Sequence, residues 1–385
     1  MKAIVLAAGE GTRLRPLTRA RPKPMLPIAN RPLLEHVLEA GREAGIDEFV
    51  FVVGYKRERI QNHFGDGDDW GVEIEYAHQR KQLGTGHAVL QAEQFVDGKF
   101  IALNGDRIVE PDAIASVIEE RREAGGPVMA VTRATDPANY GVVELDGRQV
   151  VNIEEKPPVH TVETDYINAG IYGFDESVFD DLRETESDGE LAITTTIRAS
   201  EKPVQAVPFD GLWLDVSYLW DLLSVNARAL DQFGATTGSS EDVHDRANVI
   251  GPVAKGEDVR LRPGSTVLPG TSLGDNVEVG SNAVVSNAVV LPDASIGAGA
   301  VVRDCVVGEN ASIGPNVTIE GGDAELVVDD VFYSDVRLGG VVGDNTTVGG
   351  AAVLEPGTVL GNDVRVGTGV AVEGRIENGA VVRRG

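Results

Sequence analysis

Two segments near the N-terminus combine residue types that suit a polyphosphate. The first, Gly9-Glu10-Gly11-Thr12-Arg13, follows a short apolar stretch. Glycines let backbone N–H groups approach phosphates closely, and an arginine adds a planar, permanently charged fork. Further on, prolines on both sides of Lys23 stiffen the chain around that ammonium group. The dinucleotide and Walker glycine patterns do not fit, because Leu14 stands at the third glycine position and no Gly-Lys-Ser/Thr follows.

Two further motifs indicate a metal ion and a pyrimidine base. Asp106 follows the apolar run 100–103, so its carboxylate is expected at the carboxyl edge of a sheet. Mg²⁺ prefers oxygen ligands, typically one or two carboxylates with phosphates and water. Gln79 precedes Gly84 and Thr85 at the start of an expected helix. A glutamine side chain offers a donor and an acceptor, which matches the imide edge of uracil or thymine.

The elements that must position these motifs alternate between strand and helix patterns. Buried strands separated by amphipathic helices predict an α/β domain with a mostly parallel sheet, in which ligands bind beyond the carboxyl ends of the strands. Strands are expected at 3–6, 49–53, 100–103, 142–145 and 150–153, and helices at 33–40, 88–95, 114–121 and 217–232.

The C-terminal third of the chain is a six-residue repeat. Glycine, asparagine or aspartate often follows the aliphatic position and supplies the turns of a stacked coil. The pattern resembles the left-handed parallel β-helix domains of the hexapeptide family, which usually associate as trimers. The repeated aliphatic positions are Leu261, Val267, Leu273, Val279, Val285 and Leu291, then Val301, Val307, Ile313 and Ile319, then Val342, Val348, Leu354, Leu360, Val366 and Val372.

The composition changes near residue 250. Of 46 glycines, 24 lie in 251–385, and the preceding stretch 234–240 is small and polar, as is typical of a linker. We expect an α/β domain at 1–232, a linker at 233–248 and a β-helix domain at 249–385. An insertion at 320–340 carries Phe332 and Tyr333, which predicts a protruding loop or a contact with a neighbouring subunit.

The acidic balance of the chain excludes several classes of partner. The chain has 34 Lys and Arg against 61 Asp and Glu, a net charge of −27 that would repel nucleic acids and acidic membranes. No run approaches the ~18 apolar residues of a membrane span. The absence of a signal-peptide pattern and the lone Cys305 predict a cytoplasmic protein. Because the acids are dispersed, we expect a halophilic protein of haloarchaeal source, with a melting temperature that rises with KCl.

The two phosphate-binding segments together resemble the signature of the sugar-1-phosphate nucleotidylyltransferases, or NDP-sugar pyrophosphorylases. The family pattern G-x-G-T-R-ϕ-x-P-x-T, followed by P-K-P-ϕ-ϕ-P, matches the chain from Gly9 and from Pro22, and further motifs extend the match to about residue 232. The resemblance implies a Rossmann-like domain that converts an NTP and a sugar 1-phosphate into an NDP-sugar and pyrophosphate. A sugar phosphate is already anionic, so the site must neutralise charge and align the reactants rather than supply a general base.

The resemblance also assigns residues to the nucleotide. Arg13 would bind the β- and γ-phosphates and Lys23 would approach the α-phosphate. The segment from Gln79 resembles the Q-x-x-Q-L-G-T-G-H-A motif of the N-acetylglucosamine-1-phosphate uridylyltransferases, which favours UTP and keeps dTTP as the alternative. The nucleotide-binding residues implied are Leu6, Ala7, Ala8, Gly9, Gly11, Thr12, Gln79, Gly84 and Thr85.

The metal and the sugar are assigned in the same way. Asp106 resembles the family's Mg²⁺ ligand, and Asp215 stands where the family places a second one, with a helix N-cap as the alternative role. Lys156 would bind the sugar phosphate, and either Glu154 or Glu155 would accept hydrogen bonds from sugar hydroxyls. The sugar-binding residues implied are Gly141, Glu154, Glu155 and Asn168. The sugar itself, glucose or N-acetylglucosamine, stays open.

The β-helix domain raises the question of a second activity. In bifunctional relatives it transfers an acetyl group from acetyl-CoA to glucosamine 1-phosphate, with a histidine as base. All six histidines of this chain precede residue 249, and the corresponding segment 336–344 keeps Val-Gly-Asp but lacks the family's histidine and tyrosine. We therefore expect a structural domain that forms a homotrimer or a higher homo-oligomer. Acetyl transfer and a non-catalytic regulatory subunit are the alternatives.

Overall fold

The computed structural model describes residues 1–187, 189–200, 202–234, 236–239, 241–329 and 331–384. They form two compact units, each built from several stretches of the chain. Unit 1 comprises Met1–Glu10, Pro22–Met25 and Leu33–Asp215, and unit 2 comprises Gly11–Arg21, Leu26–Pro32 and Val216–Gly385. This division differs from the expected boundary at residue 232, because the expected closing helix and two N-terminal segments group with the repeat.

A mixed sheet of nine described strands runs through unit 1. Its order is β5 (Glu73–His78), β4 (Glu48–Val53), β1 (Ala3–Ala7), β6 (Phe100–Asn104), β11 (Tyr166–Phe174), β8 (Val128–Arg133), β12 (Gln205–Pro208), β10 (Gln149–Glu155) and β9 (Gly141–Asp146). The first four strands are parallel, whereas most pairings beyond β6 are antiparallel. The sheet is thus less parallel than the sequence predicted, because β11 enters it in the opposite direction.

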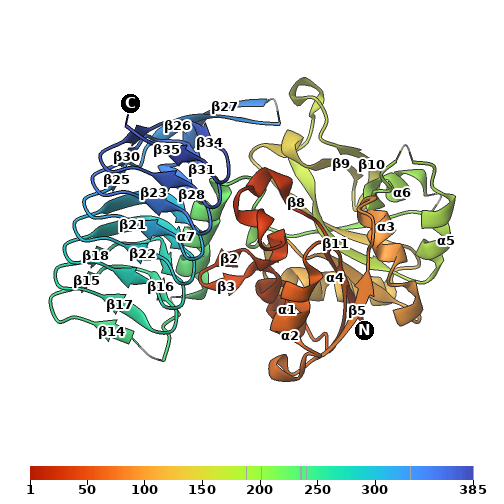
Figure 1. Cartoon of the computed structure of the whole chain (residues 1–385). Helices are drawn as coiled ribbons and strands as arrows, with labels where there is room; N and C mark the ends of the chain where they lie inside the picture. The colour runs from red at the N-terminus through yellow and green to blue at the C-terminus, as the bar shows by residue number, and fades with distance from the viewer. Residues whose placement is uncertain (188, 201, 235, 240, 330, 385) are drawn as a thin grey trace. The chain divides into compact units, whose positions relative to one another are not determined.

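Helices cover both faces of this sheet (Figure 1). Alternate residues of β1 point to opposite faces: Val5 shares an apolar cluster with α1 and α4, whereas Ile4 shares another with α3, α5 and α6. The helices are α1 (Leu33–Glu43), α2 (Arg57–Phe64), α3 (Thr85–Leu90), α4 (Pro111–Glu123), α5 (Ser177–Glu184) and α6 (Ile193–Ala199). The helix expected at 88–95 ends at Leu90, and a separate 3-10 turn follows at Glu93–Phe95.

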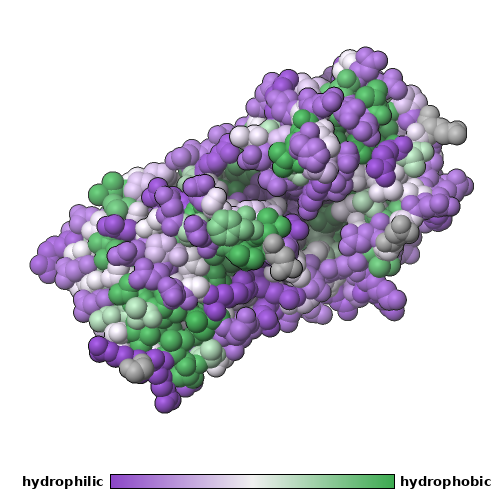
Figure 2. Space-filling model, turned by 90° about the horizontal axis from the view of Figure 1, so that it is seen from above, coloured by the Kyte–Doolittle hydropathy of each residue, from purple (hydrophilic) through white to green (hydrophobic). Residues whose placement is uncertain are grey.

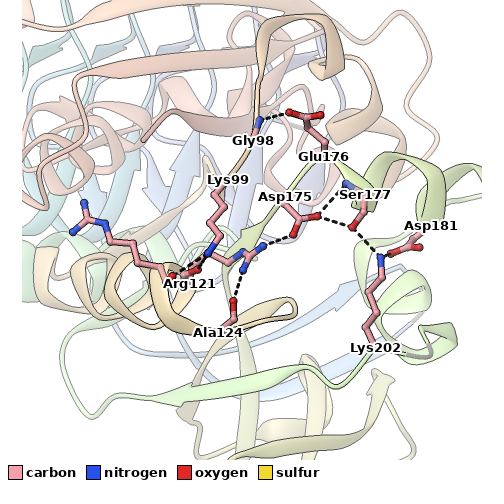
Figure 3. Close-up of polar contacts among 10 residues, drawn as sticks. Gly98, Lys99, Arg121, Ala124, Asp175, Glu176, Ser177, Asp181 and Lys202 are labelled. Carbon is pink, nitrogen blue, oxygen red and sulfur yellow. Dashed lines mark hydrogen bonds and ion pairs between the residues drawn. The ribbon is translucent and has the colours of Figure 1, made fainter.

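A buried arginine links the ends of α4, β11 and α5 (Figure 3). Arg121 is 1% exposed and forms an ion pair with Asp175, which also accepts hydrogen bonds from the backbone N–H and the hydroxyl of Ser177. A buried charge needs such partners to be tolerated. Because Phe174 pairs with Phe100, the first residue of β6, this network lies at the amino end of β6. The predicted functional motifs follow the opposite, carboxyl end.

Unit 2 is a stack of coils made of short parallel strands. Leu261 pairs with Val279, and Val267 with Val285, so each coil lies on the one before it. Buried aliphatic side chains fill the interior. The arrangement agrees with a parallel β-helix, and its handedness and trimeric assembly stay predictions. The strands are β14 (Glu241–Val243), β15 (Asn248–Val249), β16 (Val253–Lys255), β17 (Val259–Leu261), β18 (Thr266–Val267), β19 (Thr271–Leu273), β20 (Glu278–Val279), β21 (Val284–Val290), β22 (Ser295–Ile296), β23 (Val301–Val307), β24 (Ser312–Ile313), β25 (Thr318–Ile319), β28 (Gly340–Val342), β29 (Thr347–Val348), β30 (Val353–Leu354), β31 (Thr358–Leu360), β32 (Arg365–Val366), β33 (Ala371–Val372), β34 (Arg375–Ile376) and β35 (Val381–Val382).

Two coils are one residue shorter than the six-residue period predicts. Val290 and Val302 belong to the interior cluster, in place of the expected Leu291 and Val301. The shortening falls at turns where Asn287 and Asp304 adopt the left-handed conformation, each with φ of 47°. Asparagine and aspartate enter this region more readily than most residues, so a tighter corner is accommodated there.

Regular structure begins inside the expected linker. Strand β14 pairs in parallel with β17, so the coils start before residue 249. Residues 235 and 240 of the linker lie outside the described residues.

Helix α7 (Asp221–Phe233) packs on the coils through a fully buried asparagine. The Asn226 side chain donates to the carbonyl of Gly270 at 2.9 Å and accepts from the Ser272 hydroxyl and the Ala29 N–H, both at 2.8 Å. Ala29 lies between β2 (Pro27–Ile28) and β3 (Arg31–Pro32). One amide therefore joins the helix, the coils and the N-terminal hairpin, which explains why these segments form one unit.

The face in Figure 2 is largely hydrophilic, in agreement with the net charge of −27. Large apolar side chains are nevertheless exposed in the insertion, where Val327 and Phe332 are 65% and 61% accessible. Within the described residues, no helix is both long enough and apolar enough to cross a bilayer.

Candidate active site

Four charged side chains gather in unit 1. Lys23 Nζ lies 2.6 Å from Asp106 Oδ2 and 3.6 Å from Asp215 Oδ1. Arg107 forms an ion pair with Asp215, and its Nε lies 3.8 Å from Asp106 Oδ1. The Asp215 side chain is 2% exposed, whereas that of Asp106 is 29% exposed. The structure thus brings together three residues predicted to act on phosphates or Mg²⁺, and adds a fourth.

The fold explains how residues so distant in sequence meet. Gly105 follows β6 and its N–H donates to the carbonyl of Leu6, at 3.0 Å, so Asp106 emerges beside the end of β1. Strands β7 (Arg107–Val109) and β13 (Trp213–Asp215) then pair antiparallel, with Asp215 opposite Arg107. A Cβ on Gly105 would lie 2.8 Å from the Leu6 carbonyl oxygen, so this close approach requires glycine.

The electrostatics of the cluster favour the charged forms of Asp106 and Arg107. Burial raises the pKa of Asp106, but the positive charges of Lys23 and Arg107 outweigh it and lower the pKa to about 2. Burial likewise opposes the charge of Arg107, and Asp215 and Asp106 more than compensate, so its pKa is raised. The guanidinium carbon of Arg107 also lies 4.9 Å from the ring centre of Trp213.

Arg107 is a member of the cluster that the sequence motifs did not predict. The residue follows Asp106 directly, and that adjacency was the available signal. Its importance depends on the pairing of β7 with β13, which are separated by about a hundred residues.

The donor set of this cluster fits Mg²⁺. Two carboxylates share the Lys23 ammonium group between them, at 2.6 and 3.6 Å, so they already surround one cation. Mg²⁺ is usually held by one or two carboxylates, with the remaining positions filled by phosphate oxygens and water. Asp106 and Asp215 would be those carboxylates. No group of three or more His, Cys, Asp or Glu suited to a metal occurs among the described residues.

The predicted base-binding residues lie beyond the ends of β1, β4 and β5. A Cβ on Gly54 would lie 3.0 Å from the Ala8 carbonyl oxygen and 3.1 Å from that of Gln79, so the three backbones approach closely. The buried Gln79 amide donates to the Gly84 carbonyl at 3.1 Å, and the Gln82 amide donates to that of Ala8 at 2.9 Å. Two glutamine side chains therefore border the same short strand ends.

Thr85 and Gly84 are fixed by a neighbouring loop. The N–H of Ile193 donates to the Thr85 hydroxyl at 3.0 Å, which occupies that side chain at the start of α6. Gly84 has φ of 93°, and a Cβ there would lie 2.4 Å from the Leu191 carbonyl oxygen. The local fold thus requires glycine at position 84, whatever ligand it binds.

The predicted sugar residues meet where β9, β10 and β11 adjoin. A Cβ on Gly141 would lie 2.9 Å from Glu155 Oε2 and 3.5 Å from the Asn168 Cβ. Asn168 donates to the Tyr172 hydroxyl at 2.6 Å and accepts from the N–H of Gly170 at 3.0 Å. Burial is the main reason that the pKa of Tyr172 is raised, so its hydroxyl stays protonated.

The two adjacent glutamates point differently. Successive side chains of a strand face opposite sides of its sheet, and Glu155 is the one beside Gly141. Glu154 therefore projects to the other side of β10. Lys156 follows with φ of 48°, is exposed, and its N–H donates to the Tyr140 carbonyl at 2.9 Å.

Arg13 belongs to unit 2, with Gly11 and Thr12. Gly11 has φ of 65° and precedes the 3-10 turn Thr12–Leu14. The Arg13 Nε donates to Asp329 Oδ2 at 2.7 Å, and this hydrogen bond is the largest cause of its raised pKa. Its guanidinium carbon lies 5.7 Å from the ring centre of Tyr218.

Two family models match successive parts of the chain. Residues 2–232 match the family model described as nucleotidyl transferase, and residues 249–377 match the one described as GMPPB C-terminal domain. The chain is 32% identical over 411 aligned positions to the bifunctional protein GlmU of Methanococcus maripaludis strain C5, covering 99% of this chain and 97% of that protein. It is 34% identical over 305 positions to a glucose-1-phosphate thymidylyltransferase of Streptomyces griseus, covering 77% and 82%.

A solved structure extends the comparison to the fold. The UDP-glucose pyrophosphorylase from Acinetobacter baumanii superposes with a TM-score of 0.54 at 22% identity, covering 60% of this chain and 94% of that chain. The comparisons do not support a haloarchaeal source, which stays a prediction.

Proposed function

Because the chain belongs to the nucleotidyl transferase family, we propose that it transfers a uridylyl group from UTP to N-acetylglucosamine 1-phosphate or glucose 1-phosphate. The products would be a UDP-sugar and pyrophosphate. The cluster of Lys23, Arg107, Asp106 and Asp215 carries the proposal, because it joins cations that suit phosphates to carboxylates that suit Mg²⁺. It stands just beyond β6, where parallel sheets bind their ligands.

The chemistry brings two anions together. A phosphate oxygen of the sugar 1-phosphate would attack the α-phosphorus of UTP, and the bond from that phosphorus to the pyrophosphate oxygen would break. The attacking oxygen is already charged, so no side chain has to remove a proton. Lys23 would bind the α-phosphate and stabilise the charge that develops there. Mg²⁺ held by Asp106 and Asp215 would supply further charge neutralisation and align the phosphates.

The nucleoside would lie against the ends of β1 and β5. The close approach of Ala8, Gly54 and Gln79 leaves backbone carbonyls and two glutamine amides at this edge, which suits the donor and acceptor pattern of uracil. Thymine carries the same imide edge. The similarity to a glucose-1-phosphate thymidylyltransferase therefore favours dTTP as the second candidate nucleotide.

The sugar would lie against Gly141 and Asn168. We assign the hydroxyl-binding carboxylate to Glu155 rather than Glu154, because Glu155 Oε2 is the group nearest to the missing side chain of Gly141. A glycine there leaves room for a sugar ring beside the carboxylate. Lys156, exposed at the end of β10, would bind the sugar phosphate.

Arg13 would bind the β- and γ-phosphates. Its planar fork and the glycines before it suit a polyphosphate, and the backbone of Leu6 to Gly9 and of Gly11 and Thr12 would border the nucleotide.

A second activity has a specific observation in its favour, the match to a protein named bifunctional over 99% of this chain. The acetyl transfer that the resemblance implies needs a base, and residues 249–385 contain no histidine. Asp344, in the Val-Gly-Asp segment, is 4% exposed and paired with Arg21. We therefore assign no acetyl transfer to residues 249–385. Release of CoA from acetyl-CoA and glucosamine 1-phosphate would overturn this assignment.

The test of the proposed site uses two variants and a matched control. Lys23→Ala and Asp106→Ala should each lower kcat for UDP-sugar formation at least ~100-fold, the usual cost of one electrostatic contact in the transition state. Lys202→Ala is the control, because Lys202 is also paired with a carboxylate, Asp181, at 3.0 Å, but on the surface at α5. Near-normal activity in either site variant would reject the assignment.

A further inference from the structure

The insertion in the repeat forms an antiparallel hairpin that projects from the coils. Strands β26 (Asp323–Val328) and β27 (Val331–Arg337) pair with Leu326 opposite Tyr333 and Val327 opposite Phe332. Successive side chains of a strand point to opposite faces, so Tyr333 and Phe332 lie on opposite faces of the hairpin. Each shares its face with the residue that it pairs with. The Phe332 side is exposed, so the Tyr333 side is the one with partners in unit 2.

An aromatic cluster receives that side of the hairpin. The hydroxyl groups of Tyr333 and Tyr218 are 2.7 Å apart, and their ring centres are 5.0 Å apart. Trp220 stacks on Tyr218 with ring centres 4.6 Å apart and lies 5.2 Å from Tyr333. Burial and the hydrogen bond to Tyr333 raise the pKa of Tyr218 to about 12, so the Tyr218 hydroxyl keeps its proton at neutral pH.

The packing of Tyr333 on Tyr218 and Trp220 places the hairpin turn beside Arg13. Asp329, at the turn, accepts the hydrogen bond from Arg13 Nε at 2.7 Å, and the Arg13 guanidinium lies over the Tyr218 ring. The Arg13 side chain is 37% exposed and that of Asp329 is 60% exposed. The pair is thus a surface contact, which is individually weak and easily exchanged for a stronger partner.

The segment that carries Arg13 is itself anchored on the coils. Arg21 is 4% exposed, and its Nη2 lies 2.7 Å from Glu309 Oε2 and 3.1 Å from both carboxylate oxygens of Asp344. Its Nη1 donates to the Leu17 carbonyl at 3.1 Å. A buried, multiply bonded arginine holds its segment firmly, so Asp329 and Arg13 meet as parts of one body.

We propose that Asp329 competes with the nucleotide for Arg13, because a triphosphate that binds the Arg13 Nε must displace the Asp329 carboxylate. The inference rests on the proposed function, in which Arg13 binds the β- and γ-phosphates. The Asp329 carboxylate occupies the Nε–H of Arg13, and a phosphate oxygen is an alternative acceptor for that same donor. A triphosphate carries several charges and can exchange for one exposed carboxylate. The pair would therefore select against ligands with a single weak anionic group.

Asp329→Asn tests the proposal. Asparagine is nearly isosteric and tolerates the φ of 50° at this position, so the variant should fold. The dissociation constant of Mg²⁺–UTP, measured by calorimetry with the full chain, should fall about two- to fivefold. This change corresponds to roughly 0.4 to 1 kcal/mol, the usual range of exposed ion pairs. Glu325→Gln is the control, because it removes the same charge from an exposed position of the same hairpin.

A second background makes the test specific. In Arg13→Ala, Asp329→Asn should leave the dissociation constant unchanged, because the contact is already lost. An unchanged or weaker affinity in Asp329→Asn alone, an equal gain in Glu325→Gln, or a gain that persists in Arg13→Ala would overturn the proposal. Failure of the proposed function is distinguishable, since it would appear as no pyrophosphate release by the unaltered chain with any NTP.

Discussion

Arg107 offers the sharpest test of how the charged cluster is held together. In Arg107→Leu, the Asp215 carboxylate, 2% exposed, loses its ion-pair partner inside the protein. Breaking a buried pair by removing one partner costs about 3 to 5 kcal/mol. Lys23 Nζ stays 3.6 Å away, which favours the lower end of this range, while the lost contact with the Trp213 ring adds to the cost. We expect the free energy of unfolding of Arg107→Leu to fall by about 3 to 4 kcal/mol.

The chain supplies a matched control for this substitution. Arg133 is also paired with an aspartate, Asp165, and also lies over an aromatic ring, that of Tyr166, at 4.3 Å. Its side chain is 54% exposed, so water screens the pair. Arg133→Leu should therefore lower the free energy of unfolding far less than Arg107→Leu does. Both variants remove an ion pair with an aspartate and a contact with an aromatic ring, and they differ mainly in how deeply the ion pair is buried.

The assay is chemical denaturation of the full chain, followed by circular dichroism, with calorimetry to resolve more than one transition. In the double variant Arg107→Leu/Asp215→Leu, both charges are gone, so most of the lost stability should return. A loss of stability in Arg107→Leu no greater than that in Arg133→Leu would contradict the expected effect of burial. A double variant destabilised by the sum of its single substitutions would contradict it as well.

Three further expectations follow from the same contacts. The pKa of Asp106 is lowered to about 2 from an ordinary 3.8, so its charge stabilises the fold at neutral pH. This contribution is lost as the pH falls from about 4 to 2, and the free energy of unfolding of Asp106→Asn should therefore depend less on pH in that window. Gly105→Ala should push β6 away from the Leu6 carbonyl and lower activity at least ~10-fold, whereas Gly125→Ala, where a Cβ meets nothing within 4 Å, should leave activity unchanged. Asn226→Leu leaves three buried groups without their hydrogen-bond partner, and it should destabilise unit 2 by about 2 to 4 kcal/mol, measured by calorimetry.

Local pattern was enough to predict the parts of unit 1 that position the site. The apolar runs gave β1 and β6 within one residue, and the sheet edge expected for Asp106 is confirmed, because both strands are short, buried and parallel. The mixed character of the sheet was missed. The direction of β11 depends on pairings with β6 and β8 that are distant in sequence, and a periodicity carries no information about them.

The repeat was predicted nearly residue by residue, and its two errors have a common cause. Val290 and Leu291 are both aliphatic, as are Val301 and Val302, so a six-residue count cannot detect a corner that is shortened by one residue. The role of Arg107 and the anchoring of the Arg13 segment were missed for a different reason. Both depend on ion pairs between residues that tertiary structure alone brings together.

The activity proposed for this chain joins a nucleotide to a sugar 1-phosphate. The direct test is pyrophosphate release by the purified full chain with Mg²⁺, offering each NTP against a panel of sugar 1-phosphates. We predict release with UTP and either N-acetylglucosamine 1-phosphate or glucose 1-phosphate, and its loss in Lys23→Ala. Release with dTTP in place of UTP would reassign the nucleotide. No release with any pair would rule out this activity, and release that Lys23→Ala leaves intact would rule out the assigned site.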